Sequence, residues 1–371
     1  MTRQLASIQK ILNIEAIPDA DNILKCTILG WSCVIAKKDN FKVGDLVVYI
    51  EIDSVVSERP EFEFLRERKF RIRTIKLRKQ VSQGLVLPLS ILPSNKKYKE
   101  NDDVTEILGV KKYDPESDLE RKLAEGKANR TNNKIQKFLL KYPWYRRLIF
   151  KPKQGGFPKF IKKTDESRIQ LFPDICEREK NTIFQITEKL DGQSVTLFLL
   201  KKSKHKFLFW SFGSDYQFGV CSRNLYLPKE NDSSYWTIAK QYNIKKVLEN
   251  LMFTSPNNNL VVLQGEIIGN NIQGNKYKIN GYKFYAFNLL INGKPTDTKT
   301  MLFVLNDKGI ETVPLLSINF ELKPTIPEMV EYSKGKSLLA DIPREGVVIR
   351  NYDKNISFKV VNPDFLLKYE E

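Results

Sequence analysis

The chain has 371 residues, 41% of them hydrophobic, which is enough to form the cores of about two or three domains. No apolar run reaches the roughly twenty residues that cross a bilayer, and the N-terminus has no signal-peptide core, so we expect neither a membrane-spanning nor a secreted protein. The 61 basic and 44 acidic residues give a net charge of +17, which favours polyanionic partners, nucleic acid first among them. A basic surface that serves only solubility is the alternative.

The cysteines and the histidine exclude two further classes of site. Cys26, Cys33, Cys176 and Cys221 form no CxxC pair, and His205 is the only histidine, so a standard zinc cluster cannot be built. His205 stands between two lysines, which is typical of a solvated residue and disfavours a mechanism that needs an oriented imidazole. We expect an intracellular protein in a reducing compartment, either cytoplasm or nucleus.

Short alternating segments fill residues 1–100. Turn-forming residues separate the segments Ile23–Ile28, Trp31–Ala36 and Leu46–Ile52. This pattern predicts a small β-barrel as the first domain.

One expected strand of this barrel is basic. Lys69, Arg71 and Arg73 alternate with Phe70 and Ile72, so a strand here would bury its apolar face and expose three cations. Such a face suits a phosphate backbone. A charged edge strand that prevents aggregation explains the same pattern equally well.

Residues 101–165 change to helical spacing and are predicted to form a basic helical connector. Lysines and arginines outnumber acids and are interleaved with aromatic residues, so we interpret the segment as an RNA contact, with a nuclear-import signal or a solvated face as alternatives. Residues 154–158 contain two glycines and a proline and predict a hinge. The apolar stripe consists of Ile135, Phe138, Leu139 and Tyr142.

Residues 166–371 are predicted to form an α+β domain with antiparallel sheets. One helix is expected at Tyr235–Leu251. The expected strands are Phe184–Lys189, Val195–Leu200, Leu260–Glu266, Lys283–Leu290 and Gly346–Arg350.

A lysine at the end of the first of these strands carries the sharpest chemical signal. Lys189-Leu190-Asp191-Gly192 is a weak motif alone, because Asp-Gly by itself indicates only a turn. Taken singly, Phe287 is more simply a core residue and Arg223 a surface residue. In order along the chain, however, the motif is followed by Ser222-Arg223-Asn224, Gly265-Glu266, Phe284–Phe287, Glu345-Gly346 and Phe358-Lys359.

The chemistry of these residue types is coherent. A lysine attacks the α-phosphate of a nucleotide only when its amine is neutral, so we predict that the pKa of Lys189 is depressed by burial, by the cation of Lys359 and by a divalent metal. Asp191, Glu266 and Glu345 are suitable carboxylates for Mg²⁺, in large part through coordinated water.

This ordered set resembles motifs I, Ia, III, IIIa, IV and V of the covalent nucleotidyltransferase superfamily of ligases and capping enzymes, whose catalytic domains have an ATP-grasp-like fold. Only 12 residues follow Lys359, which leaves no room for the barrel that DNA ligases and capping enzymes carry after motif V. An OB-like barrel before the catalytic domain resembles the Deinococcus-type ATP-dependent RNA ligase family. Many ligases have Lys-x-Lys at motif V, whereas Val361 stands here at the second position.

The resemblance implies an RNA ligase that joins 3′-hydroxyl and 5′-phosphate ends, at nicks in duplexes, through lysyl-AMP and RNA-adenylate intermediates. It implies ATP as co-substrate, Mg²⁺ or Mn²⁺ as the metal, RNA as partner and a role in RNA repair; we expect a monomer. The alternatives are a non-catalytic RNA-binding relative and a capping-type guanylyltransferase. The implied roles are Lys189 as nucleophile, Asp191, Glu266 and Glu345 as metal-binding residues, and Arg168, Glu188, Leu190, Asp191, Gly192, Arg223, Glu266, Phe287 and Lys359 as ATP-binding residues.

Overall fold

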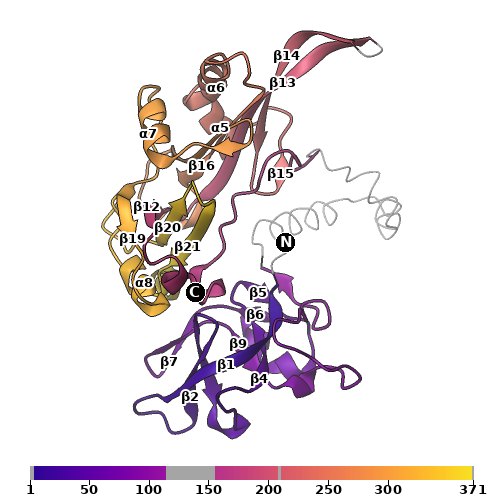
Figure 1. The fold of residues 1–371 in the computed structure, drawn as a ribbon, viewed down its shortest axis with the longest axis vertical. Helices are drawn as coiled ribbons and strands as arrows, with labels where there is room; N and C mark the ends of the chain where they lie inside the picture. Colours follow the sequence, from indigo (N-terminus) through magenta and orange to yellow (C-terminus); the bar gives the residue numbers. More distant parts are fainter. Residues whose placement is uncertain (1–3, 114–154, 208–209, 370–371) are drawn as a thin grey trace, which may run out of the picture. The chain divides into compact units, whose positions relative to one another are not determined.

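The computed structural model describes residues 4–113, 155–207 and 210–369 (Figure 1). The chain divides into two compact units. The first contains the residues up to Lys151 together with Gln170–Pro173 and Leu366–Glu371, and the second contains Pro152–Ile169 and Asp174–Phe365. Among the described residues, no helix has the length and apolar character needed to cross a membrane.

The first unit is built on a five-stranded antiparallel sheet. The strand β1 (Ala6–Ala16) pairs with both neighbours and shifts register near its middle, as a β-bulge does, so that one strand bends to serve two parts of the sheet. The strands lie in the order β3 (Trp31–Ala36), β2 (Ile23–Ile28), β1, β4 (Leu46–Ile50) and β9 (Leu85–Leu87). The bounds predicted for β2 and β3 agree with the structure, and β4 is two residues shorter than predicted.

Smaller elements complete this unit. Residues 101–113, predicted as the start of the helical connector, contain turns and the strand β10, and Val104, Leu108 and Val110 are buried in the unit. Residues 114–154 of that connector lie outside the described residues, and its last part, residues 155–165, contains the short strand β11 and turns in place of the predicted helix. The small elements are the sheet β10 (Lys111–Lys112), β5 (Ser54–Val55) and β6 (Arg71–Ile72), the hairpin β7 (Ile75–Leu77) and β8 (Gln80–Ser82), and the 3₁₀ turns η1 (Lys37–Asp39), η2 (Pro60–Arg68) and η3 (Leu89–Ile91).

The prediction of a basic strand at residues 69–73 is wrong except at Arg71 and Ile72, which form β6. Lys69 and Phe70 adopt left-handed backbone angles, with φ of 52° and 57°, because Lys69 closes the turn η2 and Phe70 then turns inward to a buried position. Arg71 lies 4.0 Å from the Asp53 carboxylate and 3.8 Å over the Tyr113 ring. The regular three-cation face that alternation predicted is therefore not formed.

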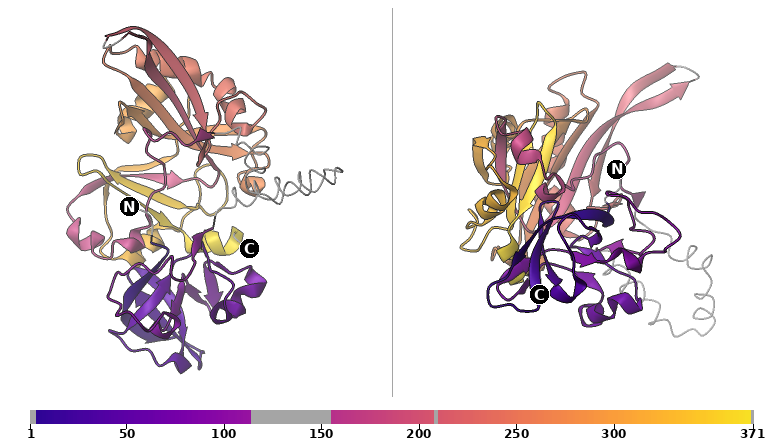
Figure 2. Two further views of the ribbon diagram at one scale, coloured as in Figure 1. Left: turned by 90° about the vertical axis from the view of Figure 1, so that its right-hand side faces the viewer. Right: turned by 60° about the horizontal axis from the view of Figure 1, so that its bottom comes forward.

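The second unit contains two antiparallel sheets (Figure 1 and Figure 2). All five predicted strands are present, several of them longer than expected. The larger sheet has the order β11 (Gly155–Gly156), β15 (Leu225–Tyr226), β14 (Trp210–Cys221), β13 (Gln193–Phe207), β16 (Leu260–Gly269), β17 (Tyr282–Ile291) and β18 (Lys294–Pro295). The smaller has the order β19 (Leu315–Glu321), β12 (Ile183–Lys189), β20 (Gly346–Asn351) and β21 (Ile356–Val361).

The single helix predicted at residues 235–251 is two helices, α5 (Ser234–Gln241) and α6 (Ile244–Met252). Asn243 adopts a left-handed conformation, with φ of 46°, which asparagine tolerates better than most residues. The break changes the chain direction, so both apolar faces pack into the core formed with β13, β16 and β17. The remaining helical segments are α4 (Ile175–Arg178), α7 (Thr298–Asn306), α8 (Ile326–Ser333), α9 (Pro363–Tyr369), η4 (Ile169–Leu171) and η5 (Gln273–Asn275).

Candidate nucleotidyl-transfer site

Strand pairing brings Lys189 to Glu345. Lys189 is the last residue of β12 and pairs with Gly346, the first residue of β20. Glu345 immediately precedes Gly346, so residues 156 positions apart meet at one end of the smaller sheet. The Lys189 Nζ atom lies 2.6 Å from the Glu345 Oε1 atom, and both side chains are largely shielded from solvent.

The turn after Lys189 packs against the larger sheet and brings the Glu266 carboxylate into the site. Gly192 packs so tightly that a Cβ atom there would lie 2.4 Å from the Ile267 carbonyl oxygen and 2.8 Å from the Glu266 Cγ atom. Ser194, at the start of β13, then pairs with Glu266 on β16. The motif therefore needs glycine at this position because the larger sheet approaches it directly.

The charges around Lys189 correct one expectation. Burial alone would lower the pKa of Lys189, but the carboxylates of Glu345, Glu266 and Asp191 together outweigh burial and raise it. The charges of the chain itself therefore raise the pKa of Lys189 instead of depressing it, and the predicted effect of a divalent metal stays a prediction. The amine is a stable ammonium ion here until another positive charge competes for these carboxylates.

The carboxylates themselves are crowded. Burial, together with the charges of Glu345 and Asp191, raises the pKa of Glu266 to about 8 despite the nearby Lys189. Burial and the charge of Asp191 likewise raise the pKa of Glu345. The Glu345 Oε2 atom is buried and has no hydrogen-bond partner within the described structure. A cation at this point would relieve the repulsion and satisfy that oxygen.

The three carboxylates do not form a complete protein cage for a metal. In the part of the chain that the structure describes, no group of three His, Cys, Asp or Glu side chains is arranged to hold an ion alone. Mg²⁺ retains several waters in most protein sites, so an incomplete set of carboxylates with an unsatisfied oxygen fits such an ion. The donor set therefore suits a metal bound mainly through water, and the predicted metal site stays a prediction.

Two further cations, Arg168 and Lys359, lie near Lys189. Arg168 forms a parallel bridge with Lys359 on β21, and the Lys359 amide donates to the Ser167 carbonyl at 2.8 Å. Burial and the neighbouring charges of Arg168 and Lys189 lower the pKa of Lys359 to about 7. Cations crowded closely enough to repel a proton form a ready site for a phosphate group.

The segment before Arg168 connects the larger sheet to the smaller one. Residues 155–169 begin at β11, which pairs with β15, and run past the larger sheet to β21. Along this path the Asp165 carboxylate forms an ion pair with Arg223, and the Thr164 hydroxyl lies 3.2 Å from that of Ser194. Sequence reasoning missed Asp165, because nothing in the local pattern distinguishes it from other acids of a loop.

An apolar cluster lies next to the motif. Leu190 and Tyr277 are buried in it, and Phe287 packs against it together with Leu339, Ala340 and Ile342. Phe287 is therefore only partly buried. One face of the ring can remain accessible to a planar ligand.

Glu188 joins this cluster to the loop at residues 337–342. Its buried Oε2 atom accepts a hydrogen bond from the Leu338 amide at 2.9 Å, whereas the Oε1 atom has no partner among the described groups. Burial raises the pKa of Glu188. A second buried acceptor is thus available beside the apolar cluster.

Asp191 has two partners that sequence reasoning also missed. Lys276 forms an ion pair with the Asp191 carboxylate, and the Asp191 amide donates to the Tyr277 hydroxyl at 3.0 Å. Both partners come from the loop between β16 and β17. Their distance of 85 residues or more from Asp191 leaves no local signal for the contact.

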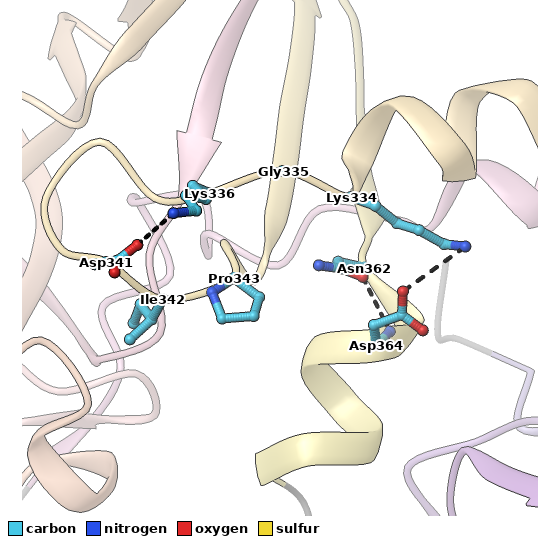
Figure 3. A pocket seen from close by; sticks show the side chains of 8 residues that line it. All are labelled: Lys334, Gly335, Lys336, Asp341, Ile342, Pro343, Asn362 and Asp364. Carbon is cyan, nitrogen blue, oxygen red and sulfur yellow. Dashed lines mark hydrogen bonds and ion pairs between the residues drawn. The ribbon is translucent and has the colours of Figure 1, made fainter.

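A surface cavity of about 310 Å³ lies beside the loop that leads to Glu345 (Figure 3). Ion pairs between Lys336 and Asp341, at 2.7 Å, and between Lys334 and Asp364, at 3.8 Å, bridge parts of its rim. None of the sequence-predicted site residues lines it. The cavity is lined by Lys334, Gly335, Lys336, Asp341, Ile342, Pro343, Asn362 and Asp364.

Comparisons with known proteins bear on the family and the fold of the chain. A sequence model described as RNA ligase matches residues 182–369, and one described as an OB-fold domain matches residues 5–89, which confirms the predicted OB-like barrel and the α+β class. No curated protein matches the chain.

Several solved structures of RNA ligase from Naegleria gruberi are similar over almost the whole chain. The structure with PPi has 32% identity, covers 100% of this chain and 99% of that chain, and has a TM-score of 0.77. A mutant with AMP and Mn has 31% identity, 99% coverage of each chain and a TM-score of 0.77. A mutant with ATP and Mn has 32% identity, 99% coverage of each chain and a TM-score of 0.76.

Proposed function

Because the chain belongs to the RNA ligase family, we propose that it joins RNA 3′-hydroxyl and 5′-phosphate ends at the expense of ATP, through an AMP bonded to Lys189. The observation that carries this proposal is the position of the Lys189 amine between three carboxylates and the cations Arg168 and Lys359. The solved relatives with ATP and Mn, with AMP and Mn, and with PPi support ATP as co-substrate, AMP and pyrophosphate as products and a divalent metal as cofactor for this chain.

In the first step, the neutral Lys189 amine attacks the α-phosphorus of ATP. A nitrogen–phosphorus bond forms, the bond to the bridging oxygen breaks, pyrophosphate leaves, and the amine gives its proton to solvent. Mg²⁺ or Mn²⁺, bound through water by Asp191, Glu266 and Glu345, would neutralise phosphate charge and draw those carboxylates away from Lys189, which lowers its pKa. Arg168 and Lys359 hold phosphate oxygens, and Arg223 contacts the sugar or phosphates.

The base is held by the apolar cluster. Adenine stacks on Phe287, and its exocyclic amino group donates to the partnerless Oε1 atom of Glu188. Guanine carries an oxygen at the corresponding position, which a carboxylate repels. This chemistry favours ATP over GTP and therefore a ligase over a capping-type guanylyltransferase.

The later steps transfer AMP to RNA. An oxygen of the RNA 5′-phosphate attacks the AMP phosphorus and releases Lys189; the 3′-hydroxyl of the other end then attacks the 5′-phosphorus and displaces AMP. We assign the chain to the Deinococcus type, acting at nicks in duplexes as in RNA repair, because its barrel precedes the catalytic unit. Val361 departs from the Lys-x-Lys pattern and leaves Lys359 as the single motif V lysine.

The proposal also covers the parts of the chain that contact RNA, the oligomeric state and the cellular compartment. The basic barrel and the connector at residues 101–165 contact RNA, and the enzyme acts as a monomer in a reducing intracellular compartment. In support of that compartment, all four cysteines are buried free thiols, although Cys26 and Cys33 stand opposite each other on β2 and β3.

Mass spectrometry after incubation with ATP and Mg²⁺ tests the first step. The wild type should gain one adenylyl group on Lys189, and GTP should give none. Lys189→Met should gain none with either nucleotide. Lys283→Met is the matched control, because Lys283 also pairs with a glutamate, Glu311 at 3.8 Å, but lies outside the proposed roles. Labelling by GTP alone would point to the guanylyltransferase, and labelling by neither nucleotide to a non-catalytic RNA-binding protein.

Nicked duplexes with each strand end made of RNA or DNA test the subclass. We expect sealing to require ribose at the 3′-hydroxyl end, and equal sealing of DNA ends would contradict the Deinococcus-type assignment. A pre-adenylated 5′ end needs no lysine nucleophile. Lys189→Met should therefore still seal it, which also shows that the variant is folded.

A further inference from the structure

The ion pair between Lys276 and Asp191 is enclosed. The exposed fractions of the two side chains are only 14% and 18%. The Lys276 Nζ atom also lies 5.4 Å from the centre of the Phe365 ring, which is buried. Low exposure strengthens the attraction of an ammonium ion for a carboxylate beyond that of a surface pair, and the ring also stabilises the ammonium ion at this position.

The loop that carries Lys276 is held in shape on both sides of it. The Asn275 side chain donates to the Ile279 carbonyl and accepts from the Ile279 amide, each at 3.0 Å. The Tyr277 side chain is buried, and its hydroxyl accepts the Asp191 amide. The backbone of Asp191 is thus anchored independently of the ion pair, so loss of the Lys276 charge leaves Asp191 in position.

Two of the three site carboxylates therefore have a lysine bound to them. Glu345 is paired with Lys189 and Asp191 with Lys276, while Glu266 interacts with Lys189 electrostatically. A divalent cation that approaches these carboxylates alone must displace two ammonium ions from an enclosed space. A nucleotide phosphate brings negative charge, to which both ammonium ions can turn.

We propose that Lys276 is a positioning residue that acts as a counter-ion for Asp191, so that a divalent metal binds strongly only together with the nucleotide. This inference rests on the proposed function, because it concerns the metal and nucleotide of that site. Thermodynamic linkage makes the effect reciprocal: the nucleotide strengthens metal binding by the same factor by which the metal strengthens nucleotide binding. The coupling keeps metal alone from occupying the carboxylates.

Binding of Mn²⁺, followed by electron paramagnetic resonance of the free ion, tests the inference without any turnover. AMP is a suitable nucleotide probe, because it chelates metal weakly and has no leaving group that Lys189 could displace. In the wild type, AMP should strengthen Mn²⁺ binding about ten-fold or more. Lys276→Met keeps the apolar stem but removes the charge; it should bind Mn²⁺ alone about ten-fold more tightly and lose most of the AMP effect.

Two further variants make the test specific. Lys276→Arg keeps the charge and should behave as the wild type. Lys278→Met removes an exposed lysine from the same loop and should leave both affinities unchanged. An unchanged or weaker Mn²⁺ affinity in Lys276→Met, with an unchanged melting temperature, would overturn the inference.

Different measurements would disprove the proposed function and this inference. If the wild type acquires the adenylyl mass while Lys276→Met binds Mn²⁺ as the wild type does, the inference alone is wrong. If no adenylyl mass appears on Lys189 of the wild type, the proposed function is wrong whatever the Mn²⁺ affinities are.

Discussion

Lys189 and Glu345, which are 156 positions apart in the sequence, form an ion pair with 2.6 Å between the Nζ and Oε1 atoms. The pairing of β12 with β20 produces this contact, because Lys189 lies opposite the residue that follows Glu345. The carboxylate stabilises the ammonium form, whereas attack on a phosphate needs the neutral amine. If Lys189 is the nucleophile, as proposed above, this contact holds it in the protonation state that cannot attack.

The first prediction concerns the protonation state of Lys189. Glu345→Gln removes the partner charge, so the pKa of Lys189, which is raised in the wild type, should fall. The pH dependence of Lys189 modification by trinitrobenzenesulfonate, read by peptide mass spectrometry, should shift to lower pH. Glu311→Gln, which removes the partner of Lys283, should leave the Lys189 profile where it is. A shift to higher pH would contradict the role assigned to Glu345.

The second prediction concerns stability and pH. The pKa of Lys359 falls from 10.5 to about 7 on folding, so the unfolded chain binds more protons between these values and stability rises with pH there. Protonated Lys359 thus opposes folding most at pH 7 and below. Lys359→Met should stabilise the protein by about 2 kcal/mol near pH 7 and abolish nucleotide binding.

That gain should shrink as the pH rises from about 7 towards about 10, because neutral Lys359 no longer repels Arg168 and Lys189. Urea unfolding at several pH values measures the difference. Lys278→Met should show no comparable trend. A gain that grows with pH would mean that the cation cluster does not oppose folding.

The third prediction concerns the motif glycine. Gly192→Ala places a methyl group 2.4 Å from the Ile267 carbonyl oxygen, so the turn must move away from the larger sheet. We expect a loss of about 1–3 kcal/mol in unfolding free energy and at least about a hundred-fold loss of adenylylation rate. Gly156→Ala, where a Cβ atom meets nothing within 4 Å, is the control and should be nearly neutral. Full activity of Gly192→Ala would show that the approach of Glu266 is dispensable.

The fourth prediction concerns the choice of nucleotide. Glu188→Gln replaces one acceptor oxygen by an amide group that can donate to guanine. The preference for ATP over GTP in the first step should fall by about ten-fold or more. Competition between labelled ATP and GTP measures the ratio. An unchanged ratio would place the base away from Glu188.

The local pattern of apolar, polar and turn-forming residues was sufficient to predict many of the strands. The strands β2 and β3 begin and end where turn residues and alternation predict, because short antiparallel strands obey a two-residue period. The same reasoning was wrong at Lys69–Phe70 and at Asn243. At these places one or two residues with left-handed backbone angles turn apolar side chains inward, and hydrophobic periodicity does not reveal such local reversals.

The nucleophile, the metal-binding carboxylates and the base-stacking ring were predicted from their order along the chain, and these roles stay predictions. What periodicity and motif order could not supply are Lys276, Tyr277 and Asp165. Each reaches its partner through a loop or segment far away in the sequence. Their residue types and neighbours are ordinary for loops.

The amino-acid sequence by itself determined which chemical groups this protein possesses: one lysine in a strand-to-turn motif, carboxylates and cations in a set order, and an excess of positive charge. Only the tertiary structure decided the protonation of those groups and their partners. The physical reason is that pKa values and ion pairs depend on burial and on distances of a few ångströms. Those distances between remote residues exist only once the two sheets of the catalytic unit have formed.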